Sequence, residues 1–63
     1  MDYRIDAMHC AGCERGVRAT VAEADPQARV AVDLDARRAS IDTTRPEAVL
    51  AALAEAGFPA VPA

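Results

Sequence analysis

Aromatic side chains are almost absent from this chain, which has one Phe, one Tyr and no Trp among its 63 residues. Alanine dominates the apolar residues, and each alanine buries little surface. A chain of this length buries only about 60% of the surface that its unfolded form exposes. The walls of a substrate pocket, usually roughly 300 Å³ or more, need larger side chains. We therefore expect one domain over residues 1–63, with a thin core and no enzymatic activity.

Lysine is absent as well, and all seven basic residues are arginines. They are spread along the chain among ten acidic residues, and the net charge is −3. Nucleic-acid-binding surfaces need clustered basic charge, often with aromatic side chains that stack on bases. The sequence therefore predicts no nucleic-acid partner.

Long apolar runs are also missing, and none approaches the ~20 residues of a membrane-spanning helix. The N-terminus lacks the basic and apolar regions of a signal peptide. A disulfide between Cys10 and Cys13 would close a very short loop and remove little chain entropy. In a reducing cytoplasm both residues stay as thiols that are free to bind metal. We therefore expect a cytoplasmic protein with no direct membrane insertion.

Hydrophobic periodicity predicts four strands and two helices. The predicted strands cover residues 2–7, 29–35, 39–42 and 58–61, with a turn at 36–38. One helix is predicted over about residues 12–24, and a second follows the third strand and ends at residue 56. The side chains expected to face the core are those of Tyr3, Ile5, Ala7, Cys13, Val17, Val21, Ala24, Val30, Val32, Leu34, Ala39, Ile41, Val49, Leu50 and Leu53.

The ends of the second helix carry their own signals. Thr44 and Glu47 have the spacing of a capping box, and Gly57 suits the left-handed residue that ends a helix. The strand after it is short because Pro59 and Pro62 have no N–H to donate. The order of elements is that of the ferredoxin-like α+β sandwich, βαββαβ. In that fold a four-stranded antiparallel sheet carries two helices on one face.

The candidate chemistry is concentrated in the segment MHCAGC, residues 8–13. Two thiols separated by two residues, where a loop enters a helix, can converge on one ion. Cys13 lies in the first predicted helical turn, where the positive end of the helix dipole favours the thiolate. Thiolates are soft ligands that favour copper(I), which is satisfied by two of them. We therefore expect Cys10 and Cys13 to bind Cu(I).

Zinc is the alternative ion. A structural Zn(II) site usually needs four N or S ligands, and this chain has two Cys and one His in all. Zinc binding would need Asp6, His9 or water to complete the shell, or a second chain. For His9 three interpretations stay open: an exposed spacer, an auxiliary ligand, or a proton-sensitive modulator.

The segment resembles the M-x-C-x-x-C signature of the heavy-metal-associated domain family. That family contains copper chaperones, N-terminal domains of copper-transporting P-type ATPases and mercury-binding proteins. The resemblance extends over essentially the whole chain, including the Gly57-Phe58 pair before the last strand. It implies that Cys10 and Cys13 are the ligands, that Met8 packs beneath the loop, and that Phe58 lies near it.

The bacterial copper chaperones within this family suggest the function. The resemblance implies a metallochaperone that passes Cu(I) to a partner, a copper-transporting P-type ATPase, by exchange of thiolate ligands. It implies a monomer without metal, and a metal-bridged dimer is an alternative for the loaded form. Since the chain starts almost on its first strand and ends just after its fourth, we expect a freestanding chaperone. The alternatives are an excised domain of a P-type metal ATPase, a mercury or zinc carrier, and a dithiol redox protein.

Overall fold

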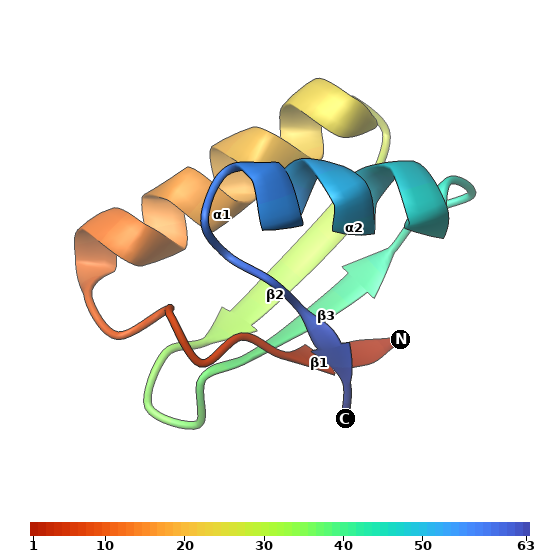
Figure 1. Ribbon diagram of the computed structural model, residues 1–63. Helices are drawn as coiled ribbons and strands as arrows, with labels where there is room; N and C mark the ends of the chain where they lie inside the picture. The colour runs from red at the N-terminus through yellow and green to blue at the C-terminus, as the bar shows by residue number, and fades with distance from the viewer.

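The six expected elements form in the expected order in the computed structural model, which describes residues 1–63 (Figure 1). They are β1 (Asp2–Arg4), α1 (Ala11–Ala24), β2 (Arg29–Asp33), β3 (Arg38–Asp42), α2 (Pro46–Glu55) and β4 (Val61–Pro62). Every strand pairing is antiparallel, and the order in the sheet is β2-β3-β1-β4. Both helices cover one face of the sheet (Figure 1). This arrangement confirms the predicted ferredoxin-like α+β fold.

Three strands, β1, β2 and β4, are shorter than predicted, whereas β3 begins one residue earlier, at Arg38, which was expected in the turn. β1 ends at Arg4 because the chain then turns, and the N–H of Met8 donates to the carbonyl of Ile5 at 3.0 Å. β2 ends at Asp33 because the next residues form a turn in which Arg37 has a φ of 56°. β4 is confined to residues 61–62. The alternation of apolar and polar residues indicates which side chains are buried. Side chains stay buried beyond the last hydrogen bond of the sheet, so the alternation extends past the end of the strand.

The start of α2 contradicts the predicted capping box. The helix begins at Pro46, its N-cap is Arg45, and no side chain caps it. A box formed by Thr44 and Glu47 would require Arg45 to be helical, and the residue before a proline avoids that conformation. Proline itself favours the first helical position. The neighbouring Thr43 accepts a hydrogen bond from the N–H of Arg45 at 3.0 Å instead.

A buried carboxylate joins the end of α1 to the connection between β3 and α2. Asp25 accepts hydrogen bonds from the hydroxyl of Thr43 at 2.6 Å and from the N–H of Gln27 at 3.1 Å. These two bonds, in that order, hold the pKa of Asp25 below its ordinary value. Burial opposes them, and the charge of Arg45 adds a smaller lowering effect. The contact fixes one end of the helix layer, away from the cysteines.

The core lies between the sheet and the two helices. Its nine buried apolar residues are Tyr3, Ile5, Met8, Val17, Val21, Ala39, Ile41, Val49 and Leu53. Among the other residues expected to face inward, the ones that pack partly buried against this core are Cys13, Ala24, Val30, Val32, Leu34 and Leu50. Ala7 was expected to continue the inward face of the first strand, but it is half-buried in the turn after β1 and lies outside the cluster.

Candidate metal centre

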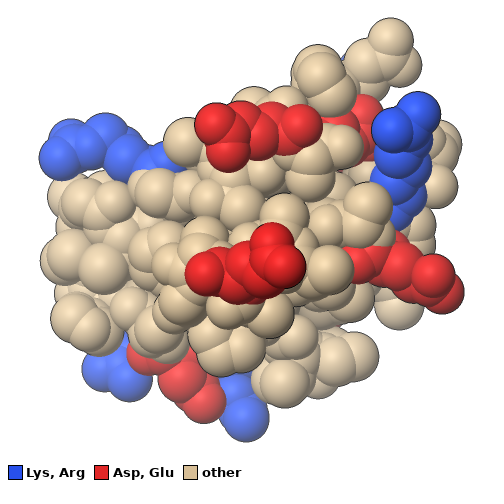
Figure 2. Space-filling model, turned by 45° about the horizontal axis from the view of Figure 1, so that its top comes forward, with Lys and Arg blue, Asp and Glu red and all other residues tan.

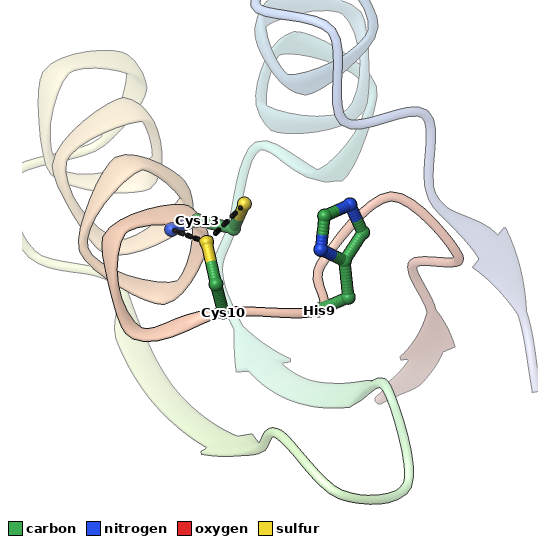
Figure 3. A group of neighbouring side chains, drawn as sticks. All are labelled: His9, Cys10 and Cys13. Atoms are coloured by element: carbon green, nitrogen blue, oxygen red, sulfur yellow. Dashed lines mark hydrogen bonds between the residues drawn. The ribbon is translucent and has the colours of Figure 1, made fainter.

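The two cysteines lie where the loop after β1 enters α1. Cys10 is the N-cap of this helix, with φ −150° and ψ 164°, and Cys13 lies in its first turn. Both are free thiols, and their sulfurs share a hydrogen bond at 2.9 Å (Figure 3). The Sγ atom of Cys10 also accepts the backbone N–H of Cys13 at 3.3 Å. The sulfur of Cys10 therefore takes the place that a Ser or Asp oxygen takes at an ordinary N-cap.

The hydrogen bonds of the Cys10 sulfur hold the pKa of this thiol below its ordinary value. The largest cause is the hydrogen bond with the Cys13 side chain, followed by the N–H of Cys13. Burial opposes these two bonds, and the N–H of Gly12 and the charge of Arg15 add smaller lowering effects. From the sequence, the effect of the helix start was expected at Cys13. The structure places it on Cys10 because α1 begins at Ala11, so the sulfur of Cys10 faces the free N–H groups of the first turn.

The two thiols differ in exposure. Cys10 is exposed, whereas Cys13 is half-buried and packs against the core. One sulfur is therefore open to an approaching protein while the other is held by the helix and its packing. This difference suits a site whose metal is exchanged, because one ligand can leave while the other keeps its position.

His9 completes a group of three donors. One ring nitrogen of His9 and the sulfurs of Cys10 and Cys13 lie within 4.8 Å of one another. The imidazole ring lies on the same side of the loop as the sulfurs (Figure 3). Asp6 lies outside this group, and its carboxylate pairs with Arg4 at 3.2 Å. Of the two side chains considered as additional zinc ligands, His9 therefore lies close to the sulfurs and Asp6 does not.

Met8 lies beneath the loop and is 0% exposed. It belongs to the same core cluster as Ile5 and Val17. Its thioether therefore fills the core, where a flexible methionine is a good gap-filler.

Phe58 is held against α1 by the way α2 ends. The N–H of Phe58 donates to the carbonyl of Leu53 at 2.8 Å, and the N–H of Gly57 donates to that of Ala54 at 3.2 Å. With Gly57 at a φ of 90°, this is a Schellman motif, as the sequence predicted for the glycine. A Cβ atom at Gly16 would lie 3.2 Å from two atoms of the Phe58 ring. This contact was not predicted from the sequence, although a glycine inside a helical pattern often marks a close approach.

The surface over the helices carries charge of both signs. In Figure 2 acidic side chains lie over the middle of this face and basic ones toward its edges, some beside acidic ones, with no large patch of one sign. Beside Cys13, Glu14 pairs with Arg18 at 3.1 Å, and Arg18 also donates to the carbonyl of Val30 at 3.1 Å. None of the helices has the length and apolar character needed to cross a membrane.

The family model described as "Heavy-metal-associated domain" matches residues 2–59. Among solved structures, the chain is similar to a gold-binding protein, with 38% identity and a TM-score of 0.89 over 95% of this chain and 94% of that one. It is also similar to the copper chaperone Atx1 from Synechocystis PCC6803, with 27% identity and a TM-score of 0.88 over 97% and 98% of the two chains. No curated protein sequence matches.

Proposed function

Since this chain belongs to the heavy-metal-associated domain family, we propose that it carries copper(I) between Cys10 and Cys13 and passes the ion to a partner protein. The observation that carries this proposal is the pair of free thiols, 2.9 Å apart at the start of a helix. Thiolates are the ligands that Cu(I) prefers. The similar proteins of known structure are named for gold and copper, two soft metals.

Transfer proceeds by exchange of thiolates. A thiolate of the partner adds to the ion while both cysteines still hold it, and the exposed Cys10 is the first to leave. A second thiolate of the partner then replaces Cys13, which packs against the core. No electron is transferred, and each step exchanges one copper–sulfur bond for another. The protein is thus a carrier rather than an enzyme, and the reducing cytoplasm keeps its thiols free.

The partner in this proposal is a copper-transporting P-type ATPase, whose own N-terminal domains belong to the same family. If the partner also binds the ion with a pair of cysteines, the free energy of the ion changes little on transfer. The rate is then set by the intermediate in which thiolates of both proteins hold the ion. The same site would serve equally in an N-terminal domain of such a transporter. The genomic reading frame beyond Ala63 decides between these two settings.

Competition with a chromogenic copper(I) chelator under reducing conditions tests the binding site. We expect Cys10→Ser and Cys13→Ser each to weaken Cu(I) binding at least about 100-fold, more than the loss of an outer-shell contact. Ser40→Ala is the matched control, because Ser40 is exposed on the face of the sheet away from the helices. Tight binding by the Cys10→Ser, Cys13→Ser double variant would refute the proposal.

Transfer is tested by mixing the loaded protein with a second domain that carries a paired cysteine site. Handover should be faster than release of copper to a chelator of equal affinity. Equal rates would mean that the ion dissociates freely, and the carrier function would then be wrong.

A zinc carrier is the second candidate, and His9 is the observation that favours it. Its ring nitrogen and the two thiolates supply three donors, and zinc accepts water as the fourth. His9→Ala should lower the zinc affinity at least about tenfold and leave copper(I) affinity unchanged. An equal loss of affinity for both metals would instead make His9 a ligand of the copper site.

A further inference from the structure

β2 is an edge strand, and β3 is its one neighbour in the sheet. Val30 lies opposite Ile41 of β3, and both backbone groups of Ile41 bond on the other side, to Met1. In an antiparallel ladder the N–H and C=O of one residue point to the same side, and the side alternates along the strand. The backbone groups of Val30 and Val32 therefore point away from β3, along the free edge.

The sequence of this strand, RVAVD over residues 29–33, is symmetric about Ala31 except that its ends carry opposite charges. In an antiparallel pairing of two copies centred on Ala31, Val30 lies opposite Val32 of the second copy. These are the two residues whose backbone groups are directed to the edge, so each such pair can exchange both of its N–H···O=C hydrogen bonds. Their side chains point to the helix layer in both copies, and the two sheets become continuous with the helices on one face.

Charge reinforces this register on the open face. Arg29 of each copy lies opposite Asp33 of the other, and opposite charges in directly opposed positions stabilise a sheet. Ala31 of one copy lies opposite Ala31 of the other, and their small methyl groups do not obstruct the pairing. If the register of the two copies shifted by one residue, the free backbone groups of Val30 would lie opposite Ala31 of the other copy. The backbone groups of Ala31 already bond to β3, so these hydrogen bonds could not form. A shift centred on Val30 would place Arg29 opposite Ala31 and lose the charge pairing.

One backbone group of the edge is occupied in the single copy. The guanidinium of Arg18 donates to the carbonyl of Val30 at 3.1 Å while its Nε atom binds Glu14 at 3.1 Å. Charged side chains laid across an edge strand are a common protection against strand pairing. Pairing requires the carbonyl of Val30 to leave Arg18, and Arg18 keeps Glu14 as a partner when it does. The contact therefore competes with association.

We propose that β2 is a self-pairing edge, through which two copies associate in the register centred on Ala31, and that Arg18 opposes this association by holding the carbonyl of Val30. No residue of the metal centre takes part. The inference is independent of the proposed function, and the two can fail separately.

Sedimentation velocity over a range of concentrations tests the proposal. All variants carry Cys10→Ser and Cys13→Ser, so that neither a bridging metal nor a disulfide can join two chains. In this background Arg18→Ala should lower the dissociation constant of the dimer at least about tenfold. Arg15→Ala is the matched control, an exposed arginine of the same helix, and should leave association unchanged.

Charge substitutions test the register. Arg29→Asp and Asp33→Arg should each prevent self-association, because like charges then meet at both ends of the paired strands. An equimolar mixture of the two variants should associate, since opposite charges are restored at both positions. Far-UV circular dichroism confirms that each variant is folded, and Arg18→Gln replaces Arg18→Ala if the latter is not. The proposal is wrong if the Arg18 variants remain monomeric, or if the mixture associates no more than its separate components.

Discussion

Substitution of Met8 separates the packing of the metal loop from the binding of metal. Met8 is 0% exposed and belongs to the cluster of nine core residues. Replacing a buried methionine with alanine costs about 2–5 kcal/mol. A domain of 63 residues has a free energy of unfolding of about 3–9 kcal/mol. Met8→Ala therefore removes a large part of the stability, and at about 4–8 °C per kcal/mol its Tm should fall by at least about 8 °C.

Met8→Leu removes the thioether but keeps the packing of the side chain. Leucine conserves the volume and the apolar character of the side chain, so this change should cost less than about 1.5 kcal/mol. Because two thiolates satisfy copper(I), the loss of the thioether should leave copper affinity unchanged. The measurements are thermal unfolding by circular dichroism and competition with a chromogenic copper(I) chelator at a temperature where both variants are folded.

The two variants have distinct refuting results. If Met8→Leu keeps its Tm but loses about tenfold or more in copper affinity, about 1.4 kcal/mol, the thioether is a ligand and the packing role is wrong. If Met8→Ala unfolds within about 2 °C of the parent, the core argument fails. Ile41→Ala is the control, because Ile41 is 2% exposed on β3. It should lose comparable stability and keep copper affinity while folded.

Three further predictions concern residues outside the ligand set. The lowered pKa of Asp25 means that its contribution to stability is complete above about pH 4, the pKa of an unfolded aspartate, and is lost as the pH falls through the folded pKa. Thr43→Val should therefore destabilise the fold most near neutral pH and progressively less in acid, as urea unfolding at several pH values would show; a constant difference would contradict this. Gly16→Ala gains about 1 kcal/mol of helix propensity, but its Cβ would lie 3.2 Å from the Phe58 ring. Overpacking costs about 1–3 kcal/mol, so we expect a lower Tm and shifted Phe58 ring resonances, and unchanged resonances would count against the contact. Gly57→Ala places a side chain at a φ of 90° and should lower the Tm by at least about 4 °C, with a smaller loss for Gly57→Asn.

Sequence patterns predicted the elements well and their ends poorly. The alternation around Val30 and the helical spacing around Val17 identified strands and helices because burial of one face repeats along each element. The ends depend on single hydrogen bonds and backbone angles. The capping box at Thr44 failed for this reason, since Pro46 set the start of α2 one residue later.

The metal centre shows the same division. The spacing of Cys10 and Cys13 predicted a two-thiol site because residues this close in the chain must meet at the start of a helix. Which thiol accepts the free N–H groups depended on the residue at which α1 begins. The approach of His9 to both sulfurs depended on the path of the loop, which no periodicity describes.

By itself, the sequence determined the order of the elements, the faces they bury, the position of the thiols and the family of the chain. These follow from patterns that each segment carries within a few residues. Only the tertiary structure decided the contacts between distant segments, such as Asp25 with Thr43 and Arg18 with Val30. The physical reason is that these partners lie in different elements, and their distance is set by how helices and sheet pack together.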